Sequence, residues 1–183
     1  MLDRIAALLI DVVVTFFVVL LLVRFHFQWL RVPFRNQVGE FVVALTNWIV
    51  RPARRVIPGI AGLDLATLLA AWVVQALGLW LLVLVAGVSA GVAALAAVAA
   101  IDLLRYSVQI LIAVVVVQAL LSWINPYTPL APVMDAATRP FLRPLRRWVP
   151  PVSNFDLTPA ILILILLIAL IPIGELREAA RAI

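Results

Sequence analysis

Cysteine and lysine are absent from this chain of 183 residues, and histidine occurs only once, as His26. Without cysteine, the sequence predicts no disulfide, no thiol nucleophile and no cysteine-ligated metal. One histidine does not build a metal site by itself. There is also no nucleophile–base pair, no carboxylate cluster in an apolar run and no Gly-rich phosphate loop. We therefore expect no enzyme activity, no metal and no cofactor.

Charge is scarce as well. Only 13% of the residues are charged while 66% are hydrophobic, and the mean hydropathy is +1.20. A soluble domain of this length would have too little polar surface to cover such a core. The apolar residues form continuous blocks without the alternation of a membrane barrel strand, which predicts an all-α membrane protein.

One segment occurs twice in the chain, at an offset of 92 positions and without a gap. Seven of the eight coinciding residues are polar, charged or proline, so shared hydrophobicity does not explain the match. The pairs are Thr46/Thr138, Arg51/Arg143, Pro52/Pro144, Arg54/Arg146, Arg55/Arg147, Pro58/Pro150, Asp64/Asp156 and Leu65/Leu157. We infer two tandem units, residues 1–86 and 87–183.

Four apolar runs predict transmembrane helices, at residues 5–23, 65–86, 107–124 and 160–173. The first run exceeds a signal-peptide core and lacks a small-residue cleavage site, so we expect an uncleaved helix that ends near Trp29. Residues 88–101 would extend only about 21 Å as a helix, which is short of the ~30 Å hydrocarbon core. An extra helix near 88–104 therefore lies on the outer side, or else extends the third span.

Nine of the 14 arginines lie in the two connectors that contain the repeated segment. They are Arg31, Arg35, Arg51, Arg54, Arg55, Arg139, Arg143, Arg146 and Arg147. The positive-inside rule places both connectors in the cytoplasm, so an even number of crossings separates them. The sequence thus predicts four spans in two parallel helix–loop–helix repeats, with amphipathic basic connectors and both termini outside.

Each connector carries an Arg-Pro-x-Arg-Arg-x-x-Pro motif. In the second one, Pro144 is expected to open a short helical turn after an extended Arg143, and Pro150 to end it. A lipid- or partner-binding motif is predicted from Arg143, Pro144, Arg146, Arg147, Trp148, Pro150 and Asp156, and from Arg51, Pro52, Arg54, Arg55, Pro58 and Asp64.

Three interpretations of these arginines stay open. They fix the topology, bind anionic lipid headgroups or a membrane-protein partner (including a second copy of the chain), or line an ion pathway. Prolines and the nearby membrane restrict them to the bilayer surface, so we expect no nucleic acid partner. Asp64 and Asp156 either cap the following helix or pair with the Arg-Arg step of their own connector.

Two further features bear on helix packing. Aligning Trp29 with Trp123 places Asp11 opposite Arg105, both near the outer interface. These two residues are interfacial charges, or else an ion pair that joins the units. The small-xxx-small spacing of residues 87–91 favours close packing of helices within the chain.

The second unit resembles the YggT (YlmG) family of small membrane proteins. The residues that carry the resemblance are Ser-Trp-Ile-Asn-Pro at 122–126, the Arg-Pro motif at 138–150, and Asp-Leu-Thr-Pro at 156–159. The first unit is degenerate, since Trp48 stands where the second has Pro140. The second unit is therefore the better functional candidate.

The resemblance implies a non-enzymatic protein of the bacterial inner membrane. It also implies a link to osmotic or envelope stress and a role in organising the membrane or its complexes. The alternative is a component of an ion-homeostasis transporter or channel. The internal duplication favours this alternative, and the small number of polar residues within the spans opposes it.

Overall fold

The computed structural model describes residues 1–59, 62–125, 127–149 and 156–181. In these ranges the chain forms six α-helices, which are α1 (Leu2–Trp29), α2 (Gln37–Val56), α3 (Leu65–Ala86), α4 (Val92–Ile124), α5 (Ala131–Trp148) and α6 (Thr158–Arg181). Of these, α1, α3, α4 and α6 are long and apolar enough to cross a membrane. The predicted all-α class with four candidate spans is confirmed.

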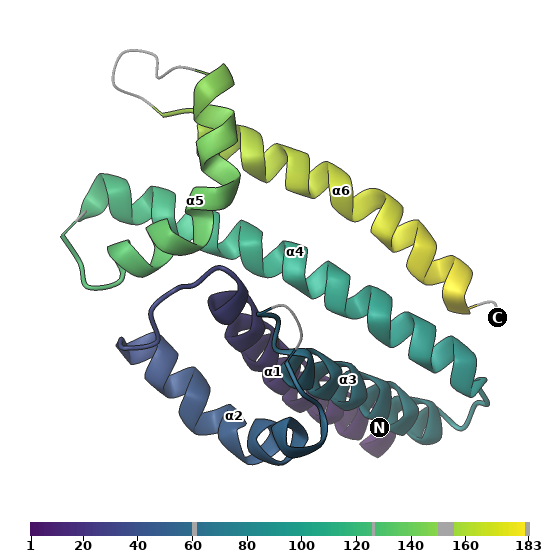
Figure 1. Ribbon diagram of the computed structural model, residues 1–183. Helices are drawn as coiled ribbons and strands as arrows, with labels where there is room; N and C mark the ends of the chain where they lie inside the picture. The colour runs from purple at the N-terminus through teal and green to yellow at the C-terminus, as the bar shows by residue number, and fades with distance from the viewer. Residues whose placement is uncertain (60–61, 126, 150–155, 182–183) are drawn as a thin grey trace.

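The spans pack in sequence, α1 on α3, α3 on α4 and α4 on α6. Figure 1 shows both chain ends on the same side of the molecule, while α2 and α5 connect the spans of each unit. Two candidate spans, α3 and α4, separate α2 from α5. The fold therefore has an even number of candidate spans between the two basic connectors, as the sequence predicted.

The expected extra helix near 88–104 is not a separate element. Residues 92–124 form one helix, so this stretch extends the third span, which is one of the two alternatives considered. Gly87 ends α3 in a left-handed conformation with φ 66°, which glycine adopts without steric cost. Residues 87–91 thus connect α3 to α4. The prediction of close helix packing there is wrong, because a Cβ at Gly87 or Gly91 would meet no atom within 4 Å. The close approach occurs at Gly78, where a Cβ would collide with Val14 of α1.

The basic connectors are longer helices than the sequence predicted. Arg143 and Pro144 both lie inside α5, which also contains Pro140, so the expected extended Arg143 and helix start at Pro144 are wrong. An internal proline costs a helix about 3 kcal/mol, and α5 bends along its length (Figure 1). Burial of the apolar face offsets this cost, since Leu142 is buried between α4 and α6.

Three hydrophobic clusters hold these helices together. The first joins α1 to α3 and α4 around Leu21, with Val50 of α2 packed beneath. A second joins the end of α1 and Val32 to α5, and thereby connects the two units. The third lies within the second unit, around Leu142. The connector helices are thus packed onto the spans by their apolar faces.

Candidate functional site

In the first unit, Arg54 near the end of α2 binds Asp64 at the start of α3. The guanidinium donates to Asp64 Oδ2 from Nη2 at 2.5 Å and from Nε at 3.2 Å. Asp64 also caps α3, because it accepts hydrogen bonds from the backbone N–H and the hydroxyl of Thr67. We call this arrangement the first clasp. Arg54 Nη2 also donates to Gln28 of α1 at 3.1 Å.

The second unit repeats the Arg–Asp pair at the equivalent positions, while the threonine that bonds the aspartate lies one position earlier in the repeat. Arg146 Nε donates to Asp156 Oδ2 at 2.9 Å. Asp156 Oδ1 accepts from the backbone N–H of Thr158 at 3.0 Å and from its hydroxyl at 2.5 Å. We call this the second clasp. The two alternatives for the aspartates therefore occur together, because each carboxylate pairs with an arginine and bonds the first turn of the next span.

The clasps lower the pKa of both carboxyl groups. Burial of Asp64 by itself would raise its pKa, but hydrogen bonds from Arg54 and Thr67 and the charge of Arg54 outweigh burial. At Asp156 burial again opposes the shift, and the bonds from Thr158 and Arg146 determine its downward direction. Both aspartates are thus held in the charged form that the arginines bind.

The other arginines of the two motifs are exposed. Arg51, Arg55, Arg143 and Arg147 belong to no ion pair within the described ranges. Large indoles lie beside them, since Trp48 is 67% exposed and Trp148 is 85% exposed. We call these arginines and tryptophans the basic surfaces of α2 and α5. The motif prolines Pro52, Pro58 and Pro144 are exposed as well, and Pro150 lies outside the described residues.

The repeated threonines Thr46 and Thr138 are fully buried. Each hydroxyl donates to the backbone oxygen four residues earlier, at 2.6 Å for Thr46 and 2.9 Å for Thr138. Thr138 also lies 3.4 Å from the backbone oxygen of Asp135 in its own helix. Thr46 has a partner on another helix, because the buried Arg24 of α1 donates to its hydroxyl at 2.8 Å. Sequence reasoning missed Arg24, which directly follows the apolar run 5–23, although a charge within a predicted membrane helix is itself a signal.

Asp11 and Arg105 are both exposed, and no ion pair within 4.0 Å joins them in the part of the chain that the structure describes. The pair between spans is another one. Arg177 of α6 donates to Asp102 of α4 from Nε at 2.5 Å and from Nη2 at 3.2 Å, and Gln75 of α3 donates to the same carboxylate at 2.9 Å.

Sequence reasoning missed this polar cluster because it ended the last span at residue 173, which placed Arg177 in a charged tail. A cavity of about 420 Å³ reaches the cluster and is lined by all four spans. The Oε1 atom of Gln75 is buried there without a hydrogen-bond partner. The Asp102 carboxylate can only accept hydrogen bonds, so the side-chain amide of Gln75 turns its nitrogen towards Asp102. The amide oxygen then points away from Asp102.

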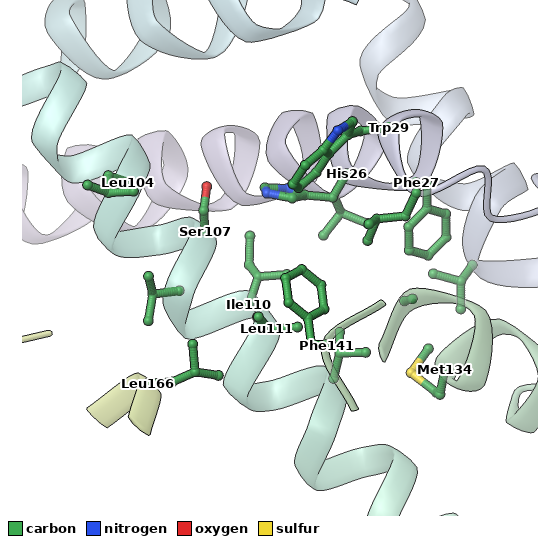
Figure 2. A pocket seen from close by; sticks show the side chains of 16 residues that line it. His26, Phe27, Trp29, Leu104, Ser107, Ile110, Leu111, Met134, Phe141 and Leu166 are labelled. Atoms are coloured by element: carbon green, nitrogen blue, oxygen red, sulfur yellow. The ribbon is translucent and has the colours of Figure 1, made fainter. Parts of the chain in front are cut away.

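A second cavity, of about 500 Å³, lies between the two units. Figure 2 shows side chains of α1, α4, α5 and α6 around it. Its lining is almost entirely apolar, with His26 and Ser107 as the polar members. Trp29 and Leu104, both half-exposed, lie among the lining residues, and the buried Phe27, Met134 and Ala137 form deeper parts of the wall.

Comparison with known proteins gives a consistent result. The profile of the CCB3/YggT family matches residues 4–85 and 97–176. The chain is similar to the protein YggT of Escherichia coli K12, with 31% identity over 176 residues that cover 93% of this chain and 90% of that protein. It is also 29% identical, over 173 residues and 92% of each chain, to a protein encoded in the proC 3′ region of Vibrio alginolyticus.

A third relative is protein PA0392 of Pseudomonas aeruginosa, with 29% identity over 147 residues that cover 78% of this chain and 75% of that protein. All three relatives are named as uncharacterized proteins. No solved structure matches the chain.

Proposed function

Since the chain belongs to the CCB3/YggT family, we propose that it is a non-enzymatic membrane protein whose two basic surfaces bind anionic lipid headgroups. Through these contacts it organises the membrane or complexes within it. The proposed place is the bacterial inner membrane, with the basic surfaces in the cytoplasm and both termini in the periplasm. A role under osmotic or envelope stress is part of the proposal and rests on the family resemblance.

The observation that carries the proposal is that some of the repeated arginines are paired with aspartates while the others are exposed. In each unit, one arginine is neutralised by the aspartate of its clasp, and this ties the connector helix to the start of the next span. Two further arginines per unit are exposed beside a tryptophan. Guanidinium groups bind phosphate in a fork geometry, and tryptophan prefers the headgroup layer, so both features favour a lipid interface.

The expected strength follows from the charges. An arginine near an anionic bilayer contributes on the order of 1 kcal/mol. Four exposed arginines acting together would therefore retain anionic lipid through detergent extraction, even after each is discounted for screening. Because the clasps hold α2 and α5 in place, the arginines are presented in a fixed arrangement.

The test is lipid retention. The full chain is purified in detergent from membranes, and the bound phosphatidylglycerol and phosphatidylethanolamine are quantified by mass spectrometry. Replacing Arg51, Arg55, Arg143 and Arg147 with Gln should lower the retained phosphatidylglycerol about tenfold. Replacing the same four with Lys should keep most of it, because the charge remains.

The matched control changes two charges elsewhere, with Gln at Arg105 and Arg181, and should leave retention unchanged. Equal loss in the control would show a general charge effect. Unchanged retention in the Gln variant would refute lipid binding at the basic surfaces.

The same surfaces offer contacts to a membrane-protein partner, including a second copy of this chain. Crosslinking in native membranes, followed by purification, compares wild type with the Gln variant. A crosslinked species that disappears in the variant would support a protein partner. If neither a partner nor enriched lipid is recovered, the organising role is refuted.

The polar cluster favours a second candidate, a component of an ion-homeostasis transporter. Charged residues within spans are costly and mark pathways. The cavity of about 420 Å³ is lined by Gln75 and Arg177, which both bond the buried Asp102. Ion flux into liposomes would be lost when Asp102→Asn and Arg177→Gln are combined, a change that keeps net charge. Liposomes that stay silent over a range of ions and voltages would count against this role.

A further inference from the structure

Within the described ranges, no fully buried polar side-chain atom without a hydrogen-bond partner lines the apolar cavity between the units. His26 Nδ1 bonds to the backbone oxygen of Leu22 at 2.6 Å, and the hydroxyl of Ser107 donates to the backbone oxygen of Leu103 at 2.7 Å. Among the described residues, the buried side-chain atoms without a partner belong to Gln75, Gln118 and Thr128, which do not line this cavity. The lining therefore favours an apolar occupant.

The cavity borders α4 over several helical turns. Its lining on that helix extends from Leu104 to Val114, which is about 15 Å of helix. The hydrocarbon core of a bilayer is ~30 Å thick, so one leaflet is roughly half of that. The length of the cavity thus matches the depth of one leaflet.

One end of the cavity is formed by the connector helices. Met134, Ala137 and Phe141 of α5 and Val38 of α2 line it there. The exposed Arg31, which belongs to no ion pair within the described ranges, directly follows the lining residue Leu30. Arg139 lies between the lining residues Ala137 and Phe141, and its guanidinium pairs with Asp135 at 2.6 Å. A molecule in the cavity therefore has positive charge at the same end as the basic surfaces.

We propose that this cavity holds one acyl chain of an anionic phospholipid whose headgroup lies at the connector helices. The inference deepens the proposed function and rests on it for the headgroup charge. The chain has four candidate membrane spans, so phospholipid surrounds the half-exposed side chains Trp29 and Leu104. An apolar cavity left empty would forfeit dispersion contacts on all its walls. An acyl chain supplies these contacts, and the lipid would join the two units.

The first test uses the unmodified chain. Phosphatidylglycerol with a photoreactive diazirine on one acyl chain is incorporated into nanodiscs with the protein, and the labelled residues are mapped by mass spectrometry. Bulk lipid labels exposed span residues such as Leu8 and Leu167. Phe27, Met134 and Ala137 are at most 8% exposed, so label on them requires a chain inside the cavity. Label confined to the exposed residues would refute the proposal.

Cavity-filling variants provide the second test. Ser107→Phe and Ala137→Phe place a ring in the cavity and should lower the label on Phe27 and Met134 about tenfold. The matched control is Val117→Phe on the same helix, at a position 40% exposed and outside the cavity lining. Circular dichroism and thermal unfolding show whether each variant is folded. Undiminished label in a folded variant would refute occupancy.

A third arm separates this proposal from the proposed function. The same photoreactive chain on phosphatidylcholine should label the cavity much less than on phosphatidylglycerol, and equal labelling would refute the anionic occupant. The variant with Gln at Arg51, Arg55, Arg143 and Arg147 separates the two proposals. If the cavity label persists while lipid retention is lost, the result supports the acyl-chain site in the cavity independently of the basic surfaces. If the cavity label is lost while lipid retention is unchanged, the result refutes the acyl-chain site in the cavity.

Discussion

The two clasps have the same chemistry but different surroundings. Asp64 of the first clasp is 4% exposed, while the carboxylate of Asp156 in the second is 37% exposed. Arg54 also binds Gln28 of α1, so the first clasp ties three helices together. The first clasp is therefore part of the packed interior, and the second remains accessible to solvent and to ligands. The unit with the more complete motif has the more accessible clasp.

The same asymmetry appears at the repeated threonines. Thr46 accepts a hydrogen bond from buried Arg24, whereas Thr138 bonds only within its own helix. At the offset of 94 that aligns Trp29 with Trp123, Arg24 corresponds to Gln118, whose buried Oε1 has no partner. The first unit has thus built polar contacts into its interior that the second unit lacks. Four sets of variants test this difference, from the largest expected effect to the smallest.

Removing the aspartate of each clasp should give the largest effect and the clearest difference. Asp64→Ala loses a buried ion pair and a helix cap, and we expect a cost of about 2 kcal/mol after discounting for the partly exposed Arg54. Asp156→Ala should cost about 1 kcal/mol, because the second clasp is more exposed.

The measurement is thermal or denaturant unfolding of the purified chain in detergent. The Asn variant at each position keeps a side-chain oxygen that accepts hydrogen bonds from the first turn of the next helix and loses only the charge, so it separates the two contributions. Equal losses for the two Ala variants would contradict the assignment of the first clasp to the interior.

Replacing the buried threonines comes next. Thr46→Val removes the only hydrogen-bond acceptor that the described residues offer to buried Arg24, and it should destabilise the fold by about 1–2 kcal/mol. Thr138→Val removes a bond within one helix and should cost less than about 0.5 kcal/mol. Both changes keep the shape of the side chain, so each serves as control for the other in the same unfolding assay. A larger loss for Thr138→Val would reverse the comparison.

Acid should release both clasps. The pKa of Asp64 and of Asp156 is lowered in the folded chain. Their contribution to stability is therefore present above the unfolded value of about 3.9 and is lost as pH falls through the folded pKa. We expect the unfolding midpoint to decline as the pH falls below about 4. The decline should be steeper in Asp156→Asn than in Asp64→Asn, because Asp156→Asn keeps the first clasp, whose loss on protonation costs more stability. A variant with both changes should have the flattest profile.

The smallest effect is expected at Gln118. Gln118→Leu removes a buried oxygen without a partner and should leave stability unchanged or raise it by about 1 kcal/mol. Arg24→Leu at the corresponding position of the first unit should instead destabilise, because it leaves Thr46 without that donor. Destabilisation by Gln118→Leu of similar size would indicate that Gln118 has a bound water or ligand.

The sequence by itself determined the class, the number of spans and the parity of the crossings. Hydropathy is a local property, so residues 65–86 could be predicted as a span and coincide with α3. The gapless repeat also identified Arg54, Arg146, Asp64 and Asp156, which form the two clasps. Partners only ten residues apart in sequence are held near each other by a short connection.

The tertiary structure alone decided which distant groups meet. Asp102 and Arg177 are 75 positions apart, and their contact depends on how α4 and α6 pack, which no local pattern encodes. The prolines of α5 lie inside a helix because burial of its apolar face outweighs the local preference for a break. The cavity between the units likewise exists only where side chains from several helices converge. These features arise from packing between helices, whereas the spans arise from the composition of each segment.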